Sequence, residues 1–125
     1  MTCFWDSILR SLTQEELDLL GTTRNNHALI QSLKNNNKLC ENIFWQGEPL
    51  HKKLLEENMD AIKEYNIGGI GSGHLCSTCD PFLCLLCELL KININHNYCN
   101  HMIKYTIKDN KRTLNFNSNT GHFSN

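Results

Sequence analysis

Several features that define common functional classes are missing from this chain of 125 residues. It has no stretch of about 18–20 apolar residues, the length that a membrane-spanning helix needs, so we expect no membrane span. It also has no basic region followed by an apolar run near its first residue, so we expect no secretion signal. The net charge is −1 and the basic residues are scattered, which does not favour binding to nucleic acid.

Phosphate-binding motifs are missing as well. The glycine-rich stretch IGGIGSG at 67–73 has neither the Lys-Ser/Thr ending of a P-loop nor the GxGxxG spacing of dinucleotide-binding proteins. We interpret this stretch as a bend in the chain, and we expect no cofactor.

Cysteine, by contrast, is plentiful, with seven residues. An odd number of cysteines without a secretion signal does not indicate a disulfide framework. We therefore expect an intracellular, cytoplasmic protein with free thiols.

Four of the cysteines form two CxxC pairs in the stretch HLCSTCDPFLCLLC. Zinc fingers usually separate such pairs by about a dozen residues or more, whereas only the four residues 80–83 lie between these pairs. Cys84 and Cys87 also lie in an apolar run, where free cysteine packs like a small hydrophobic residue. We expect both to be part of the core, and we assign no metal ligands.

Cys76 and Cys79 lie nearer the glycine-rich stretch. Together with His74 or Cys99 they offer enough ligands for a zinc site. A zinc-stabilised interaction module is therefore kept as an alternative.

Apolar residues recur at the 3.6-residue period of helices over the first two thirds of the chain. Thr13 and Glu16 have the spacing of a capping box, and Asp80 suits a helix start because proline follows it. We interpret 39–49 as a short helix and turn, and we place Pro49 in the first turn of the helix that follows. The expected longer helices span 4–12, 13–20, 25–37, 50–66 and 80–91.

After residue 90 the hydrophobic period changes from 3.6 to two. This alternation predicts strands over 91–98, 102–108 and 113–118. Helices followed by strands predict an α+β fold, which we assign to a single domain over 1–125. The sheet is expected to be three-stranded or larger, either an antiparallel meander or mixed.

Cys3 and His122 are candidates for a catalytic pair at opposite ends of the chain. Cys3 stands just before the expected helix 4–12, and a helix N-terminus lowers the pKa of a cysteine through its dipole and its free N–H groups. Those N–H groups can also stabilise an oxyanion. His122 follows the last expected strand, so a sheet can hold it. A nucleophilic cysteine and its histidine need to be adjacent only in space.

The order of the motifs is similar to that of the ovarian-tumour (OTU) family of papain-like cysteine proteases, most of which are deubiquitinases. The stretch CFWDSILRSL resembles the family's nucleophile and its helix, and GTTRNNHALIQSLKNN resembles the glycine turn and second helix. LLEENMDAIKEYNIGGIGSG resembles the helix that leads to a glycine-containing loop. DPFLCLLCELLKININHNY resembles the buried helix that runs into a strand, and RTLNFNSNTGHFS ends in the family's histidine-aromatic pair.

The resemblance implies an OTU-like fold, a thiol hydrolase activity, and ubiquitin or a ubiquitin-like protein as partner. It assigns Cys3 as nucleophile and His122 as general base. It also implies a residue that orients the histidine, for which Ser124, Asn119 and Asn125 are the candidates. Ser124 stands where the family often has Asn or Asp, and only Met1 and Thr2 precede Cys3, without the family's Asp-Gly pair. These departures favour the alternative of a weak or inactive domain that binds ubiquitin or another protein.

Overall fold

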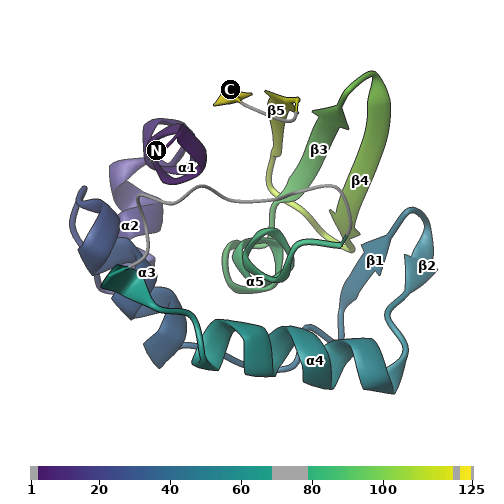
Figure 1. The fold of residues 1–125 in the computed structure, drawn as a ribbon, viewed down its shortest axis with the longest axis horizontal. Helices are drawn as coiled ribbons and strands as arrows, with labels where there is room; N and C mark the ends of the chain where they lie inside the picture. The colour runs from purple at the N-terminus through teal and green to yellow at the C-terminus, as the bar shows by residue number, and fades with distance from the viewer. Residues whose placement is uncertain (1–2, 69–78, 120–121, 125) are drawn as a thin grey trace.

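The computed structural model describes residues 3–68, 79–119 and 122–124, with the side chain of Cys3 left out. The described residues form an α+β structure in which the helices lie on one side of a mixed sheet (Figure 1). The helices are α1 (Cys3–Ser11), α2 (Gln14–Leu20), α3 (Asn26–Asn35), α4 (Lys52–Lys63) and α5 (Pro81–Leu90). The strands are β1 (Ile43–Trp45), β2 (Glu48–Pro49), β3 (Asn93–Tyr98), β4 (His101–Ile107), β5 (Thr113–Ser118) and β6 (Phe123–Ser124).

Helix α5 lies at the centre of the molecule, between the sheet and helices α2, α3 and α4 (Figure 1). Apart from the buried Glu88 its residues are apolar, and almost all of them are buried, as expected of a core helix. Its start is fixed by Asp80, whose Oδ1 accepts hydrogen bonds from the backbone N–H groups of Phe82 and Leu83 at 2.9 and 3.0 Å. The carboxylate thus satisfies two backbone donors that a helix start leaves unpaired.

The sheet has the strand order β2-β1-β4-β3-β5-β6. Strands β3 and β5 are parallel, and every other described pair is antiparallel. The hairpin between β3 and β4 turns on Cys99 and Asn100, which have positive φ angles of 47° and 70°. Two consecutive positive φ angles are typical of the type I′ turn that suits the twist of a two-residue hairpin. The connection over 108–112 then lets β5 return beside β3, on the side away from β4.

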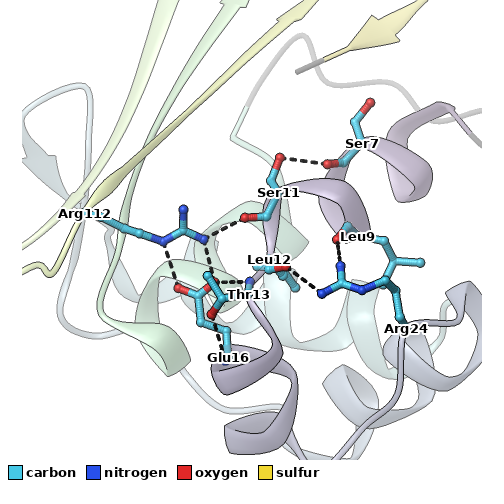
Figure 2. Close-up of polar contacts among 8 residues, drawn as sticks. All are labelled: Ser7, Leu9, Ser11, Leu12, Thr13, Glu16, Arg24 and Arg112. Atoms are coloured by element: carbon cyan, nitrogen blue, oxygen red, sulfur yellow. Dashed lines mark hydrogen bonds and ion pairs between the residues drawn. The ribbon is translucent and has the colours of Figure 1, made fainter.

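Helices α1 and α2 are held against the sheet by a polar network (Figure 2). Arg112, just before β5, donates to both carboxylate oxygens of Glu16, at 3.0 and 2.5 Å, and to the backbone oxygen of Ser11 at 2.7 Å. Arg24 donates to the backbone oxygens of Leu9 and Leu12. Both arginines therefore bind carbonyl groups at the C-terminal end of α1, where positive charge is favoured.

Glu16 gives the stability of the fold a pH dependence. Burial raises the pKa of the Glu16 carboxyl, but the hydrogen bonds from Arg112 and Thr13 outweigh this effect and bring the pKa below its ordinary value of 4.5. A carboxyl with a lowered folded-state pKa stabilises the fold fully above its unfolded pKa. This contribution is lost as the pH falls through the folded-state pKa.

We expect Glu16→Gln to be destabilising at about pH 6 and progressively less so as the pH falls through the lowered folded-state pKa, because glutamine keeps the capping-box bond but not the charge. Urea unfolding of both proteins across this range measures the difference. Glu15→Gln, on the exposed side of α2, is the matched control. If the difference in unfolding free energy between Glu16→Gln and the wild type does not change with pH, Glu16 is not the source of the pH dependence.

The structure confirms the α+β class, the five longer helices and the three strands that the sequence predicts. The short helix expected over 39–49 is wrong, because this segment is the hairpin of β1 and β2. Pro49 does not begin α4 but lies in β2 at the edge of the sheet, where a residue without an N–H group is tolerated. Helix α4 instead begins after His51, whose Nδ1 accepts from the N–H of Leu54 at 3.1 Å.

The sheet is mixed and larger than its predicted strands, because β6 and the β1–β2 hairpin extend it. Most of the glycine-rich stretch 67–73 lies outside the described residues. Over the part of the chain that is described, no helix has the length and apolar character required to cross a membrane.

Candidate functional site

The two ends of the chain meet where α1 packs against β6 (Figure 1). The rings of Phe4 and Phe123 are in contact, with their centroids 4.9 Å apart. The hydroxyl of Ser7, which is fully buried, donates to the backbone oxygen of Phe123 at 3.3 Å. Cys3 and His122 each immediately precede one of these two phenylalanines, so their backbones both lie at this junction.

His122 ends the short connection from β5 to β6. Its backbone oxygen accepts from the N–H of Asn119 at 2.9 Å, and its side chain is exposed to solvent. Because the base of this connection is hydrogen-bonded, the backbone that carries the imidazole is anchored to the sheet. His122 was expected to follow the last strand, and it does follow β5, but it also leads into β6, which the sequence pattern did not reveal.

Ser124 lies in β6 and is half-buried, and Asn125 lies outside the described residues. His122 immediately precedes β6 and is not part of the strand. Ser124 is paired in register with Asn117 of β5. Directly opposite residues share a face of the sheet, so the Ser124 and Asn117 side chains lie on the same face. No hydrogen bond joins the His122 and Ser124 side chains, both of which are described.

The first turn of α1 carries Asp6, and aspartate side chains are mostly exposed to solvent in folded proteins. Asp6 is instead half-buried, and its Oδ1 accepts from the side-chain amide of Asn26 at 2.8 Å. This contact joins the starts of α1 and α3.

His96 and Ser118 are polar residues beneath the junction that sequence reasoning did not select. His96 is fully buried, and its Nε2 lies 2.6 Å from the Ser118 hydroxyl. The signal was present in the sequence. His96 continues the inward alternation of Ile92 and Ile94, and this position faces the core.

The cysteines of α5 are core residues, as predicted. Cys84 and Cys87 are fully buried. Burial raises the pKa of the Cys87 thiol, and burial also raises that of Cys40 to about 12. These thiols are therefore poor nucleophiles.

Cys79 differs from the other buried cysteines. Its sulfur lies 3.4 Å from that of Cys84, and the hydrogen bond from Cys84 lowers the pKa of the Cys79 thiol while raising that of Cys84. The side-chain amide of Asn58 also points to the Cys79 sulfur at 3.8 Å. His74 and Cys76 lie outside the described residues. Within the described ranges no three Cys, His, Asp or Glu side chains come together as metal ligands, so the zinc site stays a prediction.

A cavity of about 270 Å³ lies far from the α1–β6 junction. It is formed by the β1–β2 hairpin and the start of α4, with Trp45, Pro49, Leu50 and Leu54 in its walls. Strands β2 and β6 are the opposite edges of the sheet. The cavity is therefore separate from the candidate site.

No protein-family model, curated protein or solved structure matches this chain. The similarity to the OTU family therefore rests on the order of the sequence motifs alone. The function has to be argued from the junction of α1 and β6.

Proposed function

We propose that the chain is a thiol hydrolase of OTU-like fold that cleaves peptide or isopeptide bonds at the C-terminal tail of ubiquitin or a ubiquitin-like protein. The observation that carries the proposal is the packing of α1, which begins at Cys3, against β6, which follows His122. Ubiquitin as the substrate rests on the resemblance to the OTU family.

In the proposed mechanism the Cys3 sulfur attacks the carbonyl carbon, and His122 takes the thiol proton. The backbone N–H groups at the start of α1 stabilise the oxyanion of the tetrahedral intermediate. The intermediate collapses to a thioester as His122 protonates the leaving amine. Water then attacks the thioester with His122 as base, which releases the carboxylic acid and restores the thiol.

Most of the other described thiols are poor candidates, which supports the choice of nucleophile. Cys79 has a lowered pKa but is buried, and Cys76 lies outside the described residues. Cys40, Cys84 and Cys87 are buried and have raised pKa values. Cys99 is exposed but lies in the β3–β4 turn, where no helix N-terminus activates it. Cys3 begins a nine-residue helix.

A ubiquitin probe with an electrophile at its C-terminus is expected to form one covalent adduct, located at Cys3 by peptide mass spectrometry. Cys3→Ala should abolish the adduct, whereas the control Cys99→Ser should keep it. If the wild-type protein stays unlabelled at every probe concentration, the enzyme proposal is wrong. Binding of unmodified ubiquitin by that unlabelled protein would support the non-catalytic alternative.

A further inference from the structure

The buried imidazole of His96 lies beneath the candidate site. It is 0% exposed, and its Nε2 lies 2.6 Å from the Oγ atom of Ser118. Buried polar groups are costly unless they are hydrogen-bonded, so this pair fixes the Ser118 side chain in one direction.

Ser118 is the last residue of β5 and the base of the connection to β6. It pairs in register with Phe123, and its backbone oxygen accepts from the N–H of Cys99 at 2.9 Å. The next residue, Asn119, donates its N–H to the backbone oxygen of His122 at 2.9 Å. One short path of hydrogen bonds and strand pairing thus connects the His96 ring to the backbone of His122.

The ring of His96 also packs directly under β6. Its centroid lies 5.2 Å from that of Phe123 and 6.2 Å from that of Tyr98. Phe123 in turn contacts Phe4 of α1 at 4.9 Å. A displacement of the His96 ring would therefore be passed to both elements that carry the candidate catalytic residues.

We propose that His96 is a positioning residue that sets the place of His122 through Ser118 and β6. The proposal deepens the proposed function and rests on it. An apolar residue at position 96 would continue the pattern of Ile92 and Ile94 without the cost of burying an imidazole. The imidazole instead gives one defined arrangement to the base of the β5–β6 connection, which apolar packing alone does not specify.

The test compares Ser118→Ala, His96→Leu and His96→Gln, all in a Cys99→Ser background. Glutamine can keep a hydrogen bond to Ser118, so His96→Gln should stay close to the wild type in probe labelling, Cys3 alkylation and Asn119 exchange. The control is Ser32→Ala, which removes another buried serine hydroxyl, bonded to the backbone oxygen of Leu20 at 2.5 Å and remote from β6. All assays are run well below the melting temperature of each variant.

Three readouts are measured. In Ser118→Ala and His96→Leu we expect labelling by the ubiquitin probe at pH 7 to slow by roughly tenfold to a hundredfold, the cost of a misplaced catalytic group. The pH profile of Cys3 alkylation by iodoacetamide should shift towards that of an ordinary thiol, about 8.5. Amide hydrogen exchange at Asn119 should speed up by up to about tenfold, corresponding to the loss of one net hydrogen bond.

The outcomes separate the two proposals. If the wild type is labelled at Cys3 but Ser118→Ala and His96→Leu match Ser32→Ala in all three readouts, the positioning role is overturned and the proposed function stands. If the wild type is not labelled but Asn119 exchange responds in Ser118→Ala and His96→Leu and is restored in His96→Gln, the proposed function is overturned. The positioning of the His122 backbone by His96 would still hold in that case.

Discussion

Replacement of His122 by alanine is expected to slow covalent labelling by the ubiquitin probe at pH 7 by about 10²–10⁴-fold, the usual contribution of a positioned general base. Without the imidazole nothing takes the proton of the Cys3 thiol, and only the thiolate fraction that forms unaided can react. The defect should shrink as the pH rises towards the ordinary thiol pKa of about 8.5, because the thiolate then forms without a base.

The measurement is the second-order rate of adduct formation between about pH 6 and 9, a range that spans the titration of an ordinary thiol. His27→Ala is the matched control, because His27 is an exposed histidine of α3 away from β6. Equal labelling rates for His122→Ala and the wild type at pH 7 would remove His122 from the mechanism. A control variant that loses the same activity would show that the effect is not specific to position 122.

Replacement of Trp5 by alanine is expected to lower the free energy of unfolding by about 3–5 kcal/mol, the range for large aromatic residues removed from a core. The Trp5 side chain is 1% exposed and its ring lies 4.8 Å from that of Phe82 in α5. Its indole N–H donates to the hydroxyl of Tyr65 at 3.1 Å. Truncation would leave a cavity between α1 and α5 and would end this hydrogen bond.

Urea unfolding followed by circular dichroism measures the loss. The control is Trp45→Ala, because Trp45, the last residue of β1, is only half-buried. Its replacement should lower the free energy of unfolding clearly less than that of Trp5. Trp5→Phe should fall between the wild type and Trp5→Ala. Similar stabilities for Trp5→Ala and Trp45→Ala would contradict the central place of Trp5 in the core.

Much of the fold could be predicted because its longer elements bury one regular face. Helix α5 has an aspartate cap and a continuous apolar run, and β3 and β4 alternate apolar and polar residues. These local signals depend on a few neighbouring residues. The same is true of the α2 capping box, where the Thr13 and Glu16 side chains both form the predicted bonds.

The short strands could not be predicted in this way. Strands β2 and β6 have two residues each, which is too few to show a period. Strand β1 is set by its pairing with β4, in which Ile43 lies opposite Ile107, far away in the sequence. The parallel pairing of β3 with β5 likewise depends on where the β4–β5 connection leads, not on the composition of either strand.

The candidate site was predicted in part. The helix start at Cys3 and the histidine-aromatic pair at His122 were visible in the sequence, and the structure brings the two segments that carry them together. The inward position of His96 was also visible, but its partner Ser118 is 22 residues away. Only the parallel register of β3 and β5 brings these two residues together.

The packing of α1 against β6 also affects how the molecule is made. The hydrogen bond from Ser7 to Phe123 spans 116 positions of the chain, so helix α1 leaves the ribosome long before strand β6. Contacts of this sequence separation cannot form until nearly the whole chain has been synthesised, and closing so long a loop costs entropy. Until then an incomplete chain carries the thiol without its base, and under the proposed function it would stay inert while nascent.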